Sequence, residues 1–152
     1  MKKTFETFAE VAQHVGQDVA ISDWLTITQD QVNQFAQATH DHQWIHTDPE
    51  RAQAGPFGGP IAHGFLTLSL LPCMFESAFE IQQTRMGVNY GLNKVRFTAP
   101  VPVGSRLRGH MHLLACDNIE PQGLQMTWQV TVEREGSDKP VCVAESVVRQ
   151  YA

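Results

Sequence analysis

One stretch in the first half of the chain gathers the residue types that proton-transfer chemistry uses. Residues 40–65 read HDHQWIHTDPERAQAGPFGGPIAHGF. The stretch contains carboxylates, imidazoles and glycine breaks, at Asp41, His42, His46, Asp48, Gly58, Gly59, His63 and Gly64. Carboxylates and imidazoles exchange protons with a substrate, and free backbone amides stabilise an oxygen that gains negative charge. These residues therefore predict a proton-transfer site.

Asp41 and His46 are the first candidates for an acid-base pair. They lie five positions apart in a segment without helical or strand periodicity. A loop lets both side chains converge on one water molecule, as a helix at that spacing would not. Two other readings stay open at this point: a cap with a loop hydrogen bond, and a metal site made of His40, His42 and His46 with Asp41.

Two helices are expected before this stretch. Apolar residues at spacings of three and four predict a short amphipathic helix over residues 4–15. Thr28 has the character of an N-cap, and Gln31 three residues later completes the pattern of a capping box. The helix that Thr28 starts should end near His40, directly before the candidate acid.

Helices are also expected within and after the stretch. Asp48 caps a short turn in which Pro49 takes the first position. Residues 62–79 are apolar on almost every side, which predicts a buried helix. Because Pro72 lies well inside this segment, the helix should either kink there or divide into two consecutive helices.

The remainder of the chain predicts strands. Residues 17–27 favour a strand that bends near Ser22 and Asp23, and further strands are expected over 88–100, 105–116, 124–135 and 140–151. Apolar and polar residues alternate most clearly over 124–133, so that strand should have one buried face and one solvent-exposed face. One early strand, a buried helix and four successive strands predict an α+β fold, with an antiparallel sheet curved around the apolar helix.

Composition limits the function classes. The chain has 152 residues, the size of one domain over 1–152, and a net charge of -5, which disfavours nucleic-acid and anionic-membrane surfaces. We expect no signal peptide, because Glu6 and Glu10 interrupt the start, and no membrane span, so the expected location is cytoplasmic. Cys73, Cys116 and Cys142 are expected to be reduced packing residues.

A continuous motif resembles a known family. The run FAQATHDHQWIHTDPERAQAGPFGGPIAHGFLTLSL, from Phe35 to Leu70, closely resembles the signature of the MaoC-like, R-specific enoyl-CoA hydratases. The run NYGLNKVRFTAPVPVGSRLR, from Asn89 to Arg108, is similar to the subgroup of nodulation protein N. The resemblance implies a hotdog fold, an acyl-CoA or acyl-carrier thioester as substrate, a homodimer with sites near its interface, and neither cofactor nor metal.

The resemblance assigns roles within the motif. It implies that Asp41 and His46 form the catalytic pair for reversible syn addition of water to a trans-2-enoyl-CoA, giving a (R)-3-hydroxyacyl-CoA. It also implies that the N–H of Gly64 binds the thioester oxygen as negative charge grows there. Under this reading His63 is a hydrogen-bonding neighbour of the site, and the adjacent residues Ile61 and Phe65 contact the substrate.

Other residues are candidates for binding the substrate. Asn89 and Asn93 are candidates for orienting the thioester, and Trp44 has the bulk to narrow the acyl channel. For the phosphates of CoA the candidates are Lys94, Arg96, Arg106 and Arg108. Two rival functions remain open: a hotdog thioesterase, which would direct the water at the carbonyl, and a catalytically silent acyl-CoA binding module.

Overall fold

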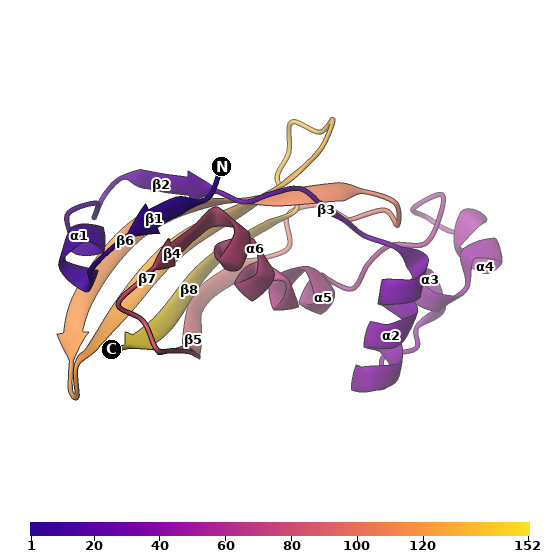
Figure 1. Cartoon of the computed structure of the whole chain (residues 1–152). Coiled ribbons are helices and arrows are strands. Elements are labelled where there is room, and N and C mark those ends of the chain that lie inside the picture. The colour runs from indigo at the N-terminus through magenta and orange to yellow at the C-terminus, as the bar shows by residue number, and fades with distance from the viewer.

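A curved antiparallel sheet forms the body of the protein (Figure 1). The computed structural model describes all 152 residues. The strands are β2 (Asp18–Ile21), β3 (Leu25–Thr26), β5 (Met86–Arg96), β6 (Arg106–Ile119), β7 (Gly123–Arg134) and β8 (Cys142–Tyr151). Their order is β2-β6-β7-β8-β5, and β3 also pairs with β6. A second, parallel pair joins β1 (Lys3–Phe5) to β4 (Phe79–Ile81).

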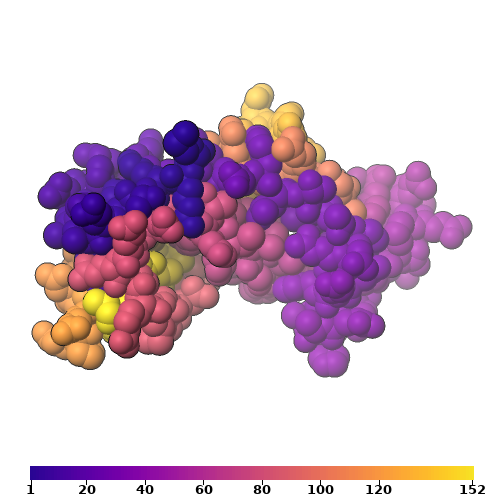
Figure 2. Space-filling model, in the orientation of Figure 1, coloured from indigo at the N-terminus to yellow at the C-terminus, as the bar shows by residue number.

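Helices lie in two places relative to this sheet. The segments α5 (Gly64–Ser69) and α6 (Leu71–Ala78) run across its concave face, so the sheet wraps around them in the expected hotdog arrangement. The segments α2 (Gln29–Thr39), α3 (Trp44–Thr47) and α4 (Pro49–Gln53) gather at one end and project from the sheet (Figure 2). The short α1 (Phe8–Ala12) lies near the opposite end. None of the helices has the length and apolar character needed to cross a bilayer.

The core lies between the sheet and α6. The inward side chains of β7, namely Leu124, Met126, Trp128, Val130 and Val132, are at most 2% exposed. The Trp128 ring meets Phe75 of α6 and Phe79 of β4 at centroid distances of 5.7 and 5.0 Å. The alternation predicted for this strand is therefore confirmed, and its apolar face is what holds α6 on the sheet.

The expected helix boundaries are confirmed in the middle of the chain. The Thr28 hydroxyl accepts a hydrogen bond from Gln31 N, which confirms the N-cap, and α2 ends with His40 as its C-cap, as predicted. The side-chain oxygen of Gln31 has no partner, so the second bond of the expected capping box is not formed. Asp48 caps α4 and Pro49 is its first residue. The apolar segment is divided into α5 and α6, and Pro72 lies in the first turn of α6, where its missing N–H is tolerated.

Two expectations about helices are wrong. Residues 4–15 do not form one helix, because Phe5 belongs to β1, where it packs edge-on against Phe79, and Thr7 caps the shorter α1. The apolar segment is not buried on all sides, since Phe65 is 66% exposed. Of the cysteines expected to pack, Cys142 is buried and Cys116 half-buried, whereas Cys73 is exposed on α6.

Candidate active site

Asp41 directly follows an unusual turn at the end of α2. His40 adopts the left-handed conformation, with φ 64°, which stops the helix and redirects the chain. Asp41 follows half-buried, and its Oδ1 accepts a hydrogen bond from the backbone N of Gln43 at 3.5 Å. The carboxylate is therefore held beside the start of α3 instead of pointing into open solvent.

His46 is held by two hydrogen bonds, one to its imidazole ring and one to its backbone. Its Nδ1 lies 2.6 Å from the carbonyl oxygen of Ile61, and because a carbonyl only accepts, Nδ1 carries the proton and Nε2 keeps a free lone pair. The side-chain Nε2 of Gln29 donates to the carbonyl oxygen of His46 at 2.8 Å, which fastens α3 to α2. His46 is 7% exposed. Nε2 is therefore the atom of His46 that can accept a proton.

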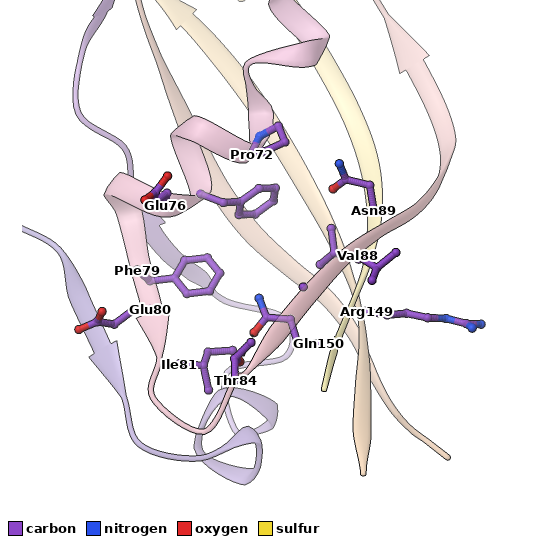
Figure 3. A pocket seen from close by; sticks show the side chains of 13 residues that line it. Pro72, Glu76, Phe79, Glu80, Ile81, Thr84, Val88, Asn89, Arg149 and Gln150 are labelled. Atoms are coloured by element: carbon purple, nitrogen blue, oxygen red, sulfur yellow. Dashed lines mark hydrogen bonds between the residues drawn. The ribbon is translucent and has the colours of Figure 1, made fainter. Parts of the chain in front are cut away.

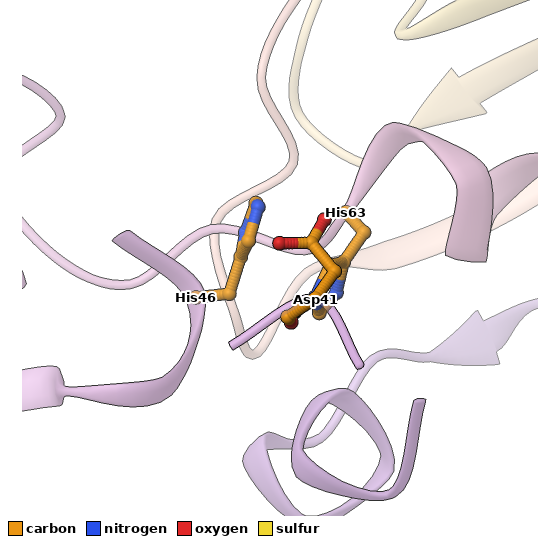
Figure 4. Close-up of side chains that lie close together, drawn as sticks. All are labelled: Asp41, His46 and His63. Carbon is orange, nitrogen blue, oxygen red and sulfur yellow. The ribbon is translucent and has the colours of Figure 1, made fainter. Parts of the chain in front are cut away.

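His63 joins the two halves of the pair (Figure 4). Its Nε2 donates to the backbone carbonyl of Asp41 at 3.0 Å. Its ring is stacked on His46, with centroids 3.8 Å apart and 25° between the planes, and Phe35 packs on it at 4.8 Å. Because His63 is only 2% exposed, these contacts fix the separation of Asp41 and His46.

Burial sets the protonation of His46. Desolvation is the largest influence and lowers the pKa of His46 below its usual value, and the adjacent His63 lowers it further. The hydrogen bond to Ile61 and the carboxylate of Asp41 act in the opposite direction without cancelling the shift. At neutral pH His46 is therefore an uncharged base beside an acidic group.

The same three side chains are the only grouping in the chain with spacing near that of metal ligands. One ligand atom from each of Asp41, His46 and His63 lies within 4.8 Å of the others. His40 and His42, which the sequence offered as ligands, are exposed and outside this group. Stacked imidazoles direct their lone pairs side by side, so they do not converge on one tetrahedral ion. The geometry fits proton transfer better than metal binding.

A cavity of about 370 Å³ opens beside His46. Its lining is mostly apolar and also contains Gly64 and Thr67; the other residues are Phe57, Ile61, Ala62, Phe97, Thr98, Ala99, Pro100, Val101 and Val141. The N–H of Gly64 has no acceptor in the protein. A Cβ at Gly64 would lie 2.8 Å from the ring of Phe97, so only glycine fits this wall without displacing the ring.

Several sequence candidates lie elsewhere. Phe65 is exposed, does not line the cavity and packs edge-on against Phe97. Asn89 lines a separate cavity of about 670 Å³ between α6, β4, β5 and β8 (Figure 3), and Asn93 is exposed on β5. Trp44 packs against Gly55 and under Arg51, so it does not narrow the cavity.

Two of the cations considered for phosphate binding are engaged elsewhere. Arg106 pairs with Glu135 at 2.9 Å, and Arg108 pairs with Glu133 at 2.7 Å. Glu133 belongs to the outward-facing residues of β7, so these cations lie on the convex face, away from the cavity. Lys94 and Arg96 are exposed near the end of β5, next to Phe97 in the cavity wall.

Sequence reasoning missed two residues of the site. The side chain of Gln29 donates a hydrogen bond to the backbone of His46, which lies 17 positions further along the chain, and no local sequence pattern predicts such a bond. Thr67 lies in the cavity wall, three residues after Gly64. Residues three positions apart lie on one face of a helix, so the sequence could have predicted that Thr67 lies beside Gly64.

The chain is similar to known proteins over almost its whole length. The family described as MaoC like domain matches residues 10–136. The 3-hydroxyacyl-thioester dehydratase Z of Mycobacterium tuberculosis is 55% identical over 150 residues, which cover 99% of both chains. Nodulation protein N of Rhizobium leguminosarum bv. viciae is 48% identical over 140 residues, or 91% of this chain and 87% of that protein. The solved (R)-hydratase from A. caviae shares the fold, with a TM-score of 0.71 at 24% identity, over 88% of this chain and 94% of that one. The chain therefore belongs to the MaoC-like dehydratase family.

Proposed function

We propose that the protein is an R-specific enoyl-thioester hydratase, which adds water reversibly to a trans-2-enoyl-CoA. The observation that carries the proposal is that His46 lies close to Asp41 and also lines one cavity with Gly64, whose N–H is free. The names of the related dehydratase and of the (R)-hydratase with the same fold support both the thioester class and the stereochemistry.

The two catalytic atoms are both hydrogen-bond acceptors. Asp41 offers its carboxylate oxygens, and His46 offers Nε2 because its Nδ1 proton is bound to Ile61. A water molecule between them donates one hydrogen to each group, which leaves an oxygen lone pair directed at the substrate. The pair thus orients the water before any proton moves.

The reaction then needs one proton removed and one returned. As the water oxygen bonds to C3, one water proton passes to the Asp41–His46 pair, and the C2–C3 π electrons move toward the thioester oxygen. The N–H of Gly64 stabilises the charge on that oxygen. A proton from the pair then bonds to C2, and the pair returns to its starting protonation. The addition involves no net oxidation, so the chemistry requires no redox cofactor.

A homodimer is the second part of the proposal. The strand β5 is 11 residues long and pairs only with β8, so its other edge is open. Its exposed apolar side chains are Met86, Val88, Tyr90 and Leu92. A long apolar edge strand is a ready surface for pairing with another chain, and a second copy satisfies it by two-fold symmetry.

One assay separates the hydratase from its rivals. The purified protein is incubated with crotonyl-CoA and with a longer enoyl-CoA while enoyl absorbance and free thiol are both measured. Loss of absorbance without thiol supports hydration. Thiol release would indicate a thioesterase, and binding without either change would indicate a silent module.

Matched variants test the assigned pair. Asp41→Asn and His46→Gln should each lower turnover by about 10²- to 10⁴-fold while the fold is preserved. His42→Gln is the control, because His42 lies in the same loop but is exposed and outside the cluster. Wild-type turnover in either of the first two variants would remove Asp41 and His46 from the chemistry.

A further inference from the structure

The hydroxyl of Thr67 is a buried polar group without a partner. Thr67 is 1% exposed, and its Oγ1 makes no hydrogen bond in the protein. Folded proteins pair most buried polar atoms, since an unpaired one costs about 1 to 3 kcal/mol of desolvation. An unpaired hydroxyl in a cavity wall therefore points to a role that the protein alone does not complete.

Other helical hydroxyls of the chain behave differently. Ser69, in the same helix, donates to the carbonyl of Phe65 at 2.7 Å. Thr39 does the same to Phe35 at 2.7 Å. This back-bonding is the usual way for a helix to satisfy a hydroxyl. Thr67 is the exception, and it is the one of these residues that lines the cavity with His46 and Gly64.

Helix geometry brings the Thr67 side chain toward Gly64. Residues three apart lie on one helical face, and each Cα–Cβ bond is tilted toward the N-terminus of the helix. The side chain of Thr67 therefore leans back over the first turn of α5, where Gly64 leaves its N–H unpaired. Gly64 and Thr67 both line this cavity, and each leaves one hydrogen-bond donor without an acceptor in the protein.

We propose that Thr67 is a second donor to the thioester oxygen, acting with the N–H of Gly64. The inference rests on the proposed hydratase function and extends its site by one catalytic residue. The thioester carbonyl accepts both bonds, and both strengthen as the C3–O bond forms and negative charge moves to that oxygen. Two donors directed at one developing charge are the usual composition of an oxyanion site.

The test uses two substitutions at Thr67 and one control. Thr67→Val keeps the shape and removes the hydroxyl, so kcat for crotonyl-CoA hydration should fall about 10²- to 10³-fold with KM nearly unchanged. Thr67→Ser keeps a donor and should retain most of the activity. Thr131→Val, on the outward face of β7, is the matched control and should behave as the wild type.

Thermal unfolding distinguishes this role from a structural one. Because the hydroxyl has no partner in the protein, Thr67→Val should leave the unfolding midpoint unchanged or raise it. An unchanged kcat in Thr67→Val would overturn the inference. So would a fall in kcat that is matched by a lowered midpoint, since that outcome assigns Thr67 to packing.

A binding probe separates failure of this inference from failure of the proposed function. Acetoacetyl-CoA forms an enolate whose oxygen carries the relevant charge, and its enolate absorbance reports that state without turnover. Thr67→Val should weaken enolate binding more than tenfold and leave butyryl-CoA binding unchanged. If the wild type hydrates no enoyl-CoA but enolate binding depends on Thr67, the hydratase function fails and the donor role stands. If the wild type hydrates enoyl-CoA and Thr67→Val binds the enolate as tightly as the wild type, only the donor role fails.

Discussion

The imidazole rings of His46 and His63 are stacked, with centroids 3.8 Å apart and 25° between their planes. One ring is the proposed base, and the other donates from Nε2 to the backbone carbonyl of Asp41 at 3.0 Å. His63 therefore touches both members of the pair without lining the cavity itself. A cation on His46 would lie against a second imidazole in a buried site, so the stack favours the neutral base.

The pH dependence of the activity should reflect this environment. Burial, assisted by His63, lowers the pKa of His46 from 6.5, so the base stays uncharged in mildly acidic solution. The acid limb of a kcat/KM profile should therefore have its midpoint below pH 6.5, as measured by crotonyl-CoA hydration in buffers of constant ionic strength. A midpoint at or above 6.5 would contradict the role of His46 as the base.

The same shift affects stability with a defined sign. The unfolded imidazole takes up a proton at a higher pH than the folded one, so His46 favours the fold above pH 6.5 and this contribution is lost as the pH falls below it.

Replacement of His63 by phenylalanine should separate its two contacts. His63→Phe keeps an aromatic ring for stacking but removes the bond to the Asp41 carbonyl and the electrostatic effect on His46. The acid limb should move to higher pH, and kcat should fall about tenfold to a hundredfold because Asp41 is less well placed. KM should change little. The control is His112→Gln, on the outward face of β6. If the acid limb of His63→Phe stays at the wild-type pH, His63 does not lower the pKa of His46.

The sequence predicts the parts of the fold that depend on neighbouring residues. The caps at Thr28 and Asp48 are local hydrogen bonds, so their patterns are visible in the chain. The alternation of β7 reflects one buried face and is equally direct. By contrast, Phe5 belongs to a strand only because β4 pairs with it from more than 70 positions away. Its local spacing favoured a helix, and the distant pairing overrode it.

The candidate site divides in the same way. Asp41, His46 and Gly64 are recognisable from the motif, and the structure gathers them. His63 was expected to be a hydrogen-bonding neighbour of the site, but its contacts, a stack and a bond across 22 positions, have no local signal in the sequence. Asn89 was a reasonable candidate by type, but β5 places it in the wall of a separate cavity beside α6. Strand register, which is set by the whole sheet, decided that outcome.

Gly64→Ala should act through its neighbour Phe97. The added Cβ would lie 2.8 Å from the ring, which is too close, so the ring or the helix must shift. Because alanine retains the backbone N–H, the expected loss of about a hundredfold in kcat/KM is one of placement. In a double-mutant cycle, Phe97→Ala should restore part of that loss, and kcat/KM for each variant is the measurement. Strictly additive effects would show that the two positions act independently.

The open edge of β5 gives the last prediction. Val88→Glu places a carboxylate opposite Arg149 of β8, which is acceptable within one protomer, but it brings charge to the proposed dimer edge. Sedimentation velocity at micromolar concentration should show a dimer for the wild type and a weakened or monomeric state for this variant. Ile21→Glu is the matched control, because Ile21 is exposed on β2 at the opposite edge of the same sheet, and it should remain dimeric. If Ile21→Glu dissociates the protein and Val88→Glu does not, the subunits meet at β2 instead. Activity that falls together with dissociation in Val88→Glu would further show that the cavity beside His46 depends on the partner subunit for its working shape.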